Sequence, residues 1–378
     1  SIGEAFGLST VEAMKYGKPV VVSKVSGNID IVDGNNTGLF FQLDEPSMII
    51  EKIEILRNDK EVYDRLSRNA LETVKKRFDL CQMLRKTGEL YTSLVPDLSV
   101  SERIRVGINT GVGRYTSNVC MKIAIDVRMI GPFAHGISRY AYSLIKVISE
   151  MDKKNNYLLI SNNNYLEDFV SCRDNFELLI NNSKLYGIRE QFHIPKILKE
   201  EGVDVFHSPS YFGPVYGSCR KVMTIHDIVP LLFPRKYSFF HQLYYHTIVK
   251  NAAKSARKII TVSENSRNDI NKYLGISLDK IVVTHNAVDE KFTIYRADKV
   301  NSIKSRYGIN GRYLLYVGNQ KPHKNVVQLI RAHNLLKGRT KHQLVIVGEK
   351  DRSVMRCLPG ELLEGVVFTG EVSDDSLY

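Results

Sequence analysis

The sequence predicts an α/β protein made of doubly wound parallel sheets, with one complete domain and two partial ones. Short apolar runs alternate with longer stretches of helical periodicity, which is typical of strands and helices in parallel α/β structure. The alternation fades once, after residue 95, and restarts at Met121. With 378 residues, 43% of them hydrophobic, the chain can build two or three domain cores.

The interruption and the start of a further domain near residue 296 divide the chain into four segments. We interpret 1–95 as the back half of a domain, 96–120 as a linker, 121–295 as a complete domain and 296–378 as the truncated front half of another. The chain is thus expected to join the tail of one protein to the head of a similar one. Its half domains either derive from two proteins or pack as one permuted domain. Packing predicts contact between residues 1–95 and 310–378, because an isolated half sheet exposes an apolar edge.

The first segment is expected to begin with a helix. Ser9 is a good N-cap residue, and the helix runs to about Tyr16, where Gly17 ends it. Alternating apolar and amphipathic stretches then predict strands at 18–23 and 38–41 and helices at 46–56 and 62–78.

The later segments repeat this alternation. The third predicts strands at 122–126, 157–161, 178–181, 203–207, 221–226, 258–263 and 280–285, and helices at 137–148, 188–200 and 239–256. The fourth predicts helices at 301–307 and 325–336 and strands at 312–317, 343–347 and 365–369. Ligands of such sheets bind beyond the carboxyl ends of the strands, so residues just after a strand are candidates for function.

The charge balance narrows the expected partners. The chain has 53 Lys and Arg against 41 Asp and Glu, a formal net charge of +12, which suits nucleic acid, an anionic membrane or phosphorylated substrates. The basic residues are dispersed, without zinc-ligand spacing or an aromatic RNA-binding signature. We therefore expect no nucleic-acid partner, and a merely solvated basic surface is the alternative.

Cysteine usage and hydropathy bear on location. Five widely spaced cysteines, never in a Cys-x-x-Cys pair, argue against a disulfide framework or a zinc site. No apolar run approaches the ~18 residues of a membrane-spanning helix, and residue 1 does not begin a signal peptide. We expect a cytoplasmic protein, with peripheral contact at the inner face of the membrane as a further expectation.

The loop and helix at residues 4–16 form the first candidate site. Gly7 permits close backbone approach to a ligand, and the helix N-terminus offers N–H groups and a partial positive charge that suit a diphosphate. Glu4 and Glu12 would flank one small volume, where both can accept hydrogen bonds from sugar hydroxyls. Alternatively, Ser9 and Glu12 have the spacing of a capping box, in which Glu12 serves only the helix end.

The same residues carry a family resemblance. The run from Glu4 to Met14, followed by Tyr-Gly-Lys-Pro-Val-Val-Val, closely resembles the Glu-x7-Glu motif of retaining, nucleotide-sugar-dependent glycosyltransferases of family 4. That family, also called glycosyl transferases group 1, has the GT-B fold of two facing Rossmann-like domains. The resemblance covers residues 1–95.

The resemblance assigns roles to this motif. It implies that Glu4 and the backbone that follows it hold the donor sugar, and that Glu12 binds the ribose hydroxyls. It therefore makes donor-binding candidates of Glu4, Phe6, Gly7, Leu8 and Glu12.

Residues 121–378 resemble the front portion of the same family. Gly136 begins a run that looks like the loop near the donor phosphates and the acceptor, although the family often has more glycines here and Gly136 is otherwise a turn residue. His226 follows a predicted strand in a His-Asp-Ile-Val-Pro run, and the resemblance implies a place at the donor sugar; a packed side chain is the alternative. We interpret His207, at another strand end, as pocket lining only.

Two lysines precede the helix at 325–336. Lys324 is expected at the helix N-terminus, where its ammonium group would neutralise charge on the leaving diphosphate. Lys321 is a further donor-binding candidate, whereas Asn319 stands where the family often has Arg and receives no role. A surface lysine in a loop is the alternative for Lys324.

The stretch at 234–245 is basic and then aromatic. It could face an acceptor or lipid headgroups, but a buried helix face is the interpretation that we favour.

The resemblance implies a retaining hexosyltransferase of polysaccharide biosynthesis. The donor is a nucleotide-diphospho-sugar, with GDP-mannose suggested and UDP-sugars open, and the acceptor is a saccharide or a lipid-linked sugar. No cofactor besides this co-substrate and no metal is expected, because basic groups and a helix terminus take the metal's role. Catalysis would clamp the reactants and stabilise the departing diphosphate, with His226 and Lys324 as catalytic candidates.

Two alternatives stay open. The chain is an inert fragment of tandem glycosyltransferases, or, less favoured, a Rossmann dehydrogenase, against which the absence of Gly-x-Gly-x-x-Gly after a strand speaks.

Overall fold

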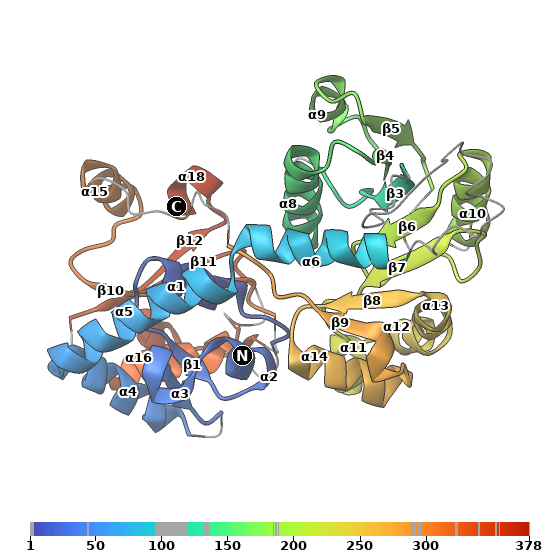
Figure 1. The fold of residues 1–378 in the computed structure, drawn as a ribbon. Coiled ribbons are helices and arrows are strands. Elements are labelled where there is room, and N and C mark those ends of the chain that lie inside the picture. The colour runs from blue at the N-terminus through green and yellow to red at the C-terminus, as the bar shows by residue number, and fades with distance from the viewer. Residues whose placement is uncertain are drawn as a thin grey trace. The chain divides into compact units, whose positions relative to one another are not determined.

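The structure is a computed structural model, shown in Figure 1. It describes residues 4–43, 45–94, 120–131, 136–183, 185, 187, 189–288, 292, 297–321, 324–338, 341–351, 354 and 356–377. The predicted linker at 96–120 lies outside these residues except for Cys120. The chain forms two compact units: unit 1 comprises residues 1–80, 263–265 and 285–378, and unit 2 comprises 81–262 and 266–284.

Unit 2 is built on a seven-stranded sheet in which every pair of neighbours is parallel. Its strands are β3 (Lys122–Asp126), β4 (Asn156–Ser161), β5 (Phe176–Ile180), β6 (Val205–Ser208), β7 (Arg220–Thr224), β8 (Lys258–Thr261) and β9 (Ile281–Val283). The order is β5-β4-β3-β6-β7-β8-β9, so the winding direction reverses between β3 and β6. In doubly wound folds, ligands bind beside such a reversal, at the carboxyl ends of the strands.

Helices cover the sheet of unit 2 (Figure 1). They are α6 (Leu80–Ser93), α8 (Gly136–Met151), α9 (Glu167–Ser171), α10 (Glu190–Glu200), α11 (Val229–Leu232), η1 (Pro234–Lys236), α12 (Phe239–Tyr244), η2 (Tyr245–Val249), α13 (Lys250–Ser255), α14 (Glu264–Asp269), η3 (Ile270–Leu274) and η4 (Leu278–Lys280). In one core, α10 packs against β3, β4 and β6. In another, η2 and α13 pack against β7 and β8. Consecutive buried residues along β3 show that both faces are covered, as expected of a parallel sheet.

Unit 1 contains two further parallel sheets. One is β10 (Tyr313–Val317), β11 (Gln343–Val347) and β12 (Val366–Gly370), and the other pairs β1 (Val21–Ser23) with β2 (Leu39–Phe41). The helices are α1 (Leu8–Lys15), α2 (Ser26–Ile31), α3 (Gly34–Thr37), α4 (Pro46–Asn58), α5 (Lys60–Arg77), α15 (Ala297–Arg306), α16 (Val326–Leu335), η6 (Gly360–Leu363) and α18 (Asp374–Leu377). Along β11, Leu344 and Ile346 pack towards α16, whereas Val345 and Val347 belong to a second core with Ile309.

The N-terminal and C-terminal parts of the chain contact each other within unit 1. Helix α4 packs against α16, and Figure 1 shows the blue and the orange-to-red segments together in this unit. The backbone N–H of Val288 donates to the carbonyl of Phe78, and the rings of Tyr16 and Phe292 lie edge to face with centroids 6.0 Å apart. The expected contact between residues 1–95 and 310–378 is therefore present, while the division into four segments stays a prediction.

The predicted α/β class with parallel sheets is confirmed. One local expectation is wrong: α1 begins at Leu8 with Gly7 as its N-cap, so Ser9 lies inside the first turn. The predicted helix at 239–256 is continuous in sequence, but a π-helical segment, η2, separates α12 from α13. Within the described part of the chain, no helix combines the length and apolarity needed to cross a bilayer.

Candidate functional site

The first candidate site lies in unit 1, where Glu4 and Lys324 form a salt bridge. The Nζ of Lys324 lies 2.6 Å from Oε2 of Glu4, and each side chain keeps 20% of its surface exposed. Glu4 lies in the loop that leads into α1, and Lys324 precedes α16 by two residues. Glu4 and Lys324 are thus in direct contact, although they lie 320 positions apart in the sequence. The sequence predicted that they bind opposite parts of one ligand.

The loop of Glu4 is held by its backbone. The carbonyl of Glu4 accepts a hydrogen bond from the N–H of Gly27 at 2.7 Å, and its own N–H donates to Oγ of Ser26 at 3.4 Å. A Cβ at Gly27 would lie 2.3 Å from the carbonyl oxygen of Ala5, a distance that no side chain tolerates. Glycine is therefore required at position 27 for α2 to approach this loop.

The residues after Glu4 contribute mainly through their backbone. Phe6 is buried, and its ring lies edge to face with Phe78 and stacks on His285, with centroids 5.6 and 6.1 Å apart. Its side chain therefore belongs to the core. Gly7 is buried too, and an added Cβ would meet Oδ1 of Asn28 at 2.9 Å. Leu8, the first residue of α1, is half-buried. Of these donor-binding candidates, the Phe6 side chain is therefore placed as a packing group.

Glu12 lies in the middle of α1 and is half-buried. Because Gly7 occupies the N-cap position and no side chain caps this end, the alternative capping box of Ser9 and Glu12 does not form. The physical reason is the early start of the helix, which leaves Ser9 in its first turn.

Lys324 is held by its backbone just before α16. Its N–H donates to the carbonyl of Lys321 at 2.8 Å, and Asn325, the N-cap of α16, has φ 54° and ψ 39°. It is the one non-glycine residue with positive φ among those the structure describes, and such strain is typical of functional loops. Lys321 itself is exposed, and its N–H donates to Oδ1 of Asn319 at 3.3 Å.

A phenol lies close to this salt bridge. The hydroxyl of Tyr316 donates to the carbonyl of Asn319 at 2.9 Å. Burial, and then the charge of Glu4, raise the pKa of Tyr316 well above its ordinary value. The hydroxyl therefore stays protonated and acts as a donor beside the carboxylate.

Glycines mark the carboxyl ends of β10, β11 and β12. Gly318, Gly348 and Gly370 all have positive φ. A Cβ at Gly348 would lie 2.3 Å from the carbonyl of Gly318, so bare backbone lines this edge of the sheet. In open α/β sheets, this edge is where ligands bind.

The second candidate region is in unit 2, where His226 follows β7. Its Nε2–H donates to the carbonyl of Pro209 at 3.2 Å, and its ring meets Tyr140 edge to face at 4.7 Å. Burial lowers the pKa of His226 to about 4, against the opposing effect of the Pro209 hydrogen bond. The imidazole is therefore neutral at pH 7, with its lone pair on Nδ1.

Gly136 is the first residue of α8 and is exposed. An added Cβ would meet no atom within 4 Å, so its immediate surroundings do not require glycine. The rest of the expected glycine-containing loop, residues 132–135, lies outside the described residues.

The interpretation of His207 as pocket lining is wrong. The residue is fully buried, its Nδ1 shares a hydrogen bond with the hydroxyl of Tyr91, and its Nε2 lies 2.8 Å from Oγ1 of Thr224. Burial, and then the proximity of His226, lower the pKa of His207 to about 3. It is a neutral core residue that joins α6 to β6 and β7.

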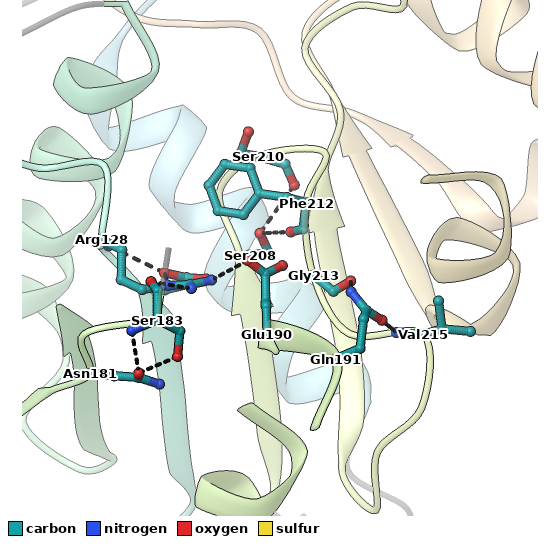
Figure 2. A network of polar contacts seen from close by, with 11 residues as sticks. Arg128, Asn181, Ser183, Glu190, Gln191, Ser208, Ser210, Phe212, Gly213 and Val215 are labelled. Carbon is teal, nitrogen blue, oxygen red and sulfur yellow. Dashed lines mark hydrogen bonds and ion pairs between the residues drawn. The ribbon is translucent and has the colours of Figure 1, made fainter. Parts of the chain in front are cut away.

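Sequence reasoning missed a buried ionic cluster beside the reversal in unit 2 (Figure 2). Arg128 donates from Nε to Oδ1 of Asp126 at 2.9 Å and from Nη2 to Oδ2 at 2.5 Å, while Nη2 lies 3.2 Å from Oε2 of Glu190. All three side chains are fully buried. Burial opposes the guanidinium charge, but the two carboxylates outweigh it and raise the pKa of Arg128. The only local signal was an Asp at the end of a strand and an Arg two residues later.

The loop at 209–215, between β6 and β7, is anchored from several sides (Figure 2). Gln191 donates to the carbonyl of Gly213 at 3.1 Å and accepts from the N–H of Val215 at 2.8 Å. Lys221 donates to the carbonyls of Pro214 and Val215 at 3.0 and 2.6 Å. Because the carbonyl of Pro209 in this loop accepts a hydrogen bond from Nε2–H of His226, the anchors also fix the orientation and tautomer of that imidazole.

No group of three or more His, Cys, Asp or Glu with metal-binding geometry occurs in the part of the chain that the structure describes.

Comparisons with known families point to one class of enzyme. A model described as "Glycosyltransferase Family 4" matches residues 135–292, and one described as "Glycosyl transferases group 1" matches residues 1–73. The first match contains His226 and Gly136, and the second contains Glu4 and Glu12.

Curated relatives agree with these matches. O-antigen chain mannosyltransferase B of Escherichia coli is 26% identical over 277 residues, which is 71% of this chain and 69% of that protein. O-antigen chain mannosyltransferase RfbU of Salmonella typhimurium is 29% identical over 161 residues, 42% of each chain. Among solved structures, Anabaena HepE in complex with UDP and glucose is 16% identical and covers 68% of this chain and 71% of its own, with a TM-score of 0.49.

The two family models and these relatives cover both units of the chain, and they lead to one conclusion. The chain is a glycosyltransferase, and it is similar to family 4, whose fold is GT-B, over residues 135–292 and to group 1 over residues 1–73.

Proposed function

We propose that this glycosyltransferase moves a hexosyl group, mannosyl first, from a nucleotide-diphospho-sugar to a saccharide or lipid-linked acceptor with retention at the anomeric carbon. GDP-mannose is the first donor to test and a UDP-sugar the second. The names of the two O-antigen mannosyltransferases support mannosyl transfer in polysaccharide biosynthesis. A cytoplasmic location with peripheral membrane contact is part of the proposal.

The observation that carries the proposal is the salt bridge between Glu4 and Lys324. A partly exposed pair of this kind contributes little to stability, about 0–1 kcal/mol. It therefore costs little to separate, and a ligand with both hydroxyls and a diphosphate offers a new partner to each member.

When the donor binds, Lys324 is proposed to turn to the diphosphate, and Glu4 to accept hydrogen bonds from the sugar hydroxyls. A positioned ammonium stabilises the negative charge that develops on the departing nucleotide. The exposed Lys321 adds positive charge beside it, and Glu12 binds the ribose. The backbone at Gly7 and Leu8 lies beside Glu4 and contacts the donor there.

His226, in unit 2, is a further catalytic candidate on the resemblance. Because Nε2–H is held by Pro209, Nδ1 can accept a hydrogen bond from a sugar hydroxyl. Gly136 is retained as a donor-binding candidate on the resemblance. No cofactor and no metal is part of this proposal, since basic side chains and the α16 N-terminus supply the positive charge.

Isothermal titration calorimetry on the full chain tests donor binding. We expect binding of GDP-mannose or of a UDP-sugar, and a loss of roughly tenfold to hundredfold in affinity for Lys324→Ala, because charge-assisted hydrogen bonds contribute about 1.5–3 kcal/mol.

Lys337→Ala is the matched control. Lys337 also forms a salt bridge in unit 1, with Glu364 at 3.1 Å, and it should bind the donor as wild type does. No measurable binding of any nucleotide sugar by the wild-type chain would instead favour the inert fragment.

A further inference from the structure

One part of unit 2 combines exposed aromatic side chains with an unusual run of charge. Residues 228–263 contain no Asp or Glu, although the whole chain has 41. Within the run lie six basic residues, Arg235, Lys236, Lys250, Lys254, Arg257 and Lys258. The elements η1, α12, η2 and α13 fall inside it.

The helical run from α12 to α13 has one face in the core and one in solvent. Its inner face, with Tyr245, Val249 and Ala252, packs against β7 and β8. At its N-terminal end, Phe239 and Phe240 are 71% and 78% exposed, and their rings lie edge to face with centroids 6.2 Å apart. The expectation that the stretch at 234–245 forms a buried helix face is therefore wrong at α12.

The outer face continues from aromatic to basic. Leu243 is 46% exposed and follows Phe239 by one helical turn. Beyond the π-helical segment, the partly exposed Lys250 and the exposed Lys254 lie on α13. Arg235 precedes the aromatic pair and is exposed. Among the described residues, none forms an ion pair with Arg235, Lys250 or Lys254.

We infer that this face, defined by Phe239, Phe240, Leu243, Arg235, Lys250 and Lys254, docks onto an anionic lipid bilayer. Aromatic side chains of an interfacial helix enter the headgroup and acyl boundary, while basic side chains meet lipid phosphates. The acid-free run supplies the charge complementarity, and no carboxylate within it would repel the headgroups. The inference gives the proposed membrane contact a defined surface, and it uses none of the residues assigned to the donor.

The absence of tryptophan from the chain provides a direct probe. In Phe239→Trp, the new indole is the single one present, and its emission should shift to shorter wavelength when vesicles of phosphatidylglycerol and phosphatidylcholine are added. Phe192→Trp is the matched control, because Phe192 on α10 is also 71% exposed and should show no shift. A shift of equal size in both variants, or in neither, overturns the inference.

Vesicle sedimentation measures the affinity. Binding should need the anionic lipid, weaken as salt is raised, and fall roughly tenfold for each of Phe239→Ser and Phe240→Ser, because burial of a Phe side chain is worth about one such factor or more. The double variant Lys250→Glu with Lys254→Glu should weaken vesicle binding by a similar factor for each reversed charge. Phe192→Ser and Lys196→Glu on α10 are the controls and should bind as wild type does.

Equal binding to neutral vesicles, or unchanged binding by the Phe239 and Phe240 variants, overturns the inference. So does a loss of self-association in these variants, seen by sedimentation velocity, without a loss of vesicle binding. Calorimetry of donor binding on the same variants should be unchanged, so failure of this inference and failure of the proposed function are distinguishable.

Discussion

The ion pair of unit 1 and the ionic cluster of unit 2 show opposite uses of charge. Glu4 and Lys324 are 20% exposed and meet across 320 positions of sequence. Asp126, Arg128 and Glu190 are fully buried, and two of them are only two residues apart. A partly exposed pair separates at little cost, whereas a fully buried pair is strongly destabilising to break because a charge is left without a partner. The first is suited to exchange partners with a ligand, and the second holds a loop in place.

The largest expected effect is on the buried cluster. Arg128→Met should lower the free energy of unfolding by about 3–5 kcal/mol, because two buried carboxylates lose their counter-charge. Urea denaturation measures it. Arg235→Met, at an exposed site without an ion pair among the described residues, is the control and should change stability by less than about 0.5 kcal/mol. A loss below about 1 kcal/mol for Arg128→Met would mean that the two regions do not differ as described.

Gly27→Ala should come next, with a cost of about 1–3 kcal/mol from overpacking against the backbone of Ala5. Because the same contact holds the loop of Glu4, donor affinity should fall together with stability. Gly360→Ala in unit 1 is the control, since its Cβ would meet nothing within 4 Å. If Gly27→Ala has the same free energy of unfolding as wild type, the close contact between Gly27 and Ala5 does not hold the loop of Glu4.

The buried histidine predicts how stability depends on pH. His207 has a pKa of about 3 in the folded chain, below its ordinary value of about 6.5, so the unfolded chain binds the proton first as pH falls. Its contribution to stability is complete above pH 6.5 and declines towards pH 3, by at most about 1.4 kcal/mol per pH unit. His207→Gln should flatten this decline in unfolding experiments between pH 7 and 5. The exposed His193→Gln is the control, and an equal flattening by both variants would contradict the assignment.

The smallest expected effect is on stability at the exposed pair. Lys324→Ala should change the free energy of unfolding by no more than about 1 kcal/mol, because a partly exposed ion pair contributes little. Urea denaturation beside Lys337→Ala measures it. A loss as large as that of Arg128→Met would make Lys324 a structural residue and remove the contrast between the two regions.

Local sequence predicted the strands well. The bounds of β3 and β11 match the predicted 122–126 and 343–347, because continuous apolar runs bounded by polar residues mark buried parallel strands. The start of α1 was missed, since Gly7 competes with Ser9 for the N-cap position. The exposure of Phe239 was missed as well, because apolar spacing alone does not show which side of a helix meets the core.

Contacts between distant residues explain the other differences. The roles of Glu4 and Lys324 were suggested by motifs, but their contact depends on how unit 1 brings two ends of the chain together. His207 is buried because Tyr91 reaches it from α6, 116 residues earlier, and Glu190 lies far in sequence from Arg128. Neither partner leaves a local pattern, so only the folded structure reveals them.

The central claim is that the pair of Glu4 and Lys324 opens to receive the two ends of one activated sugar. Calorimetry of Glu4→Gln with the nucleotide sugar and with the free nucleoside diphosphate tests it most directly. We predict roughly tenfold or greater weakening for the nucleotide sugar, and unchanged or tighter binding of the diphosphate, because Lys324 is released from its carboxylate. Equal weakening for both ligands, or no change for either, would contradict the claim.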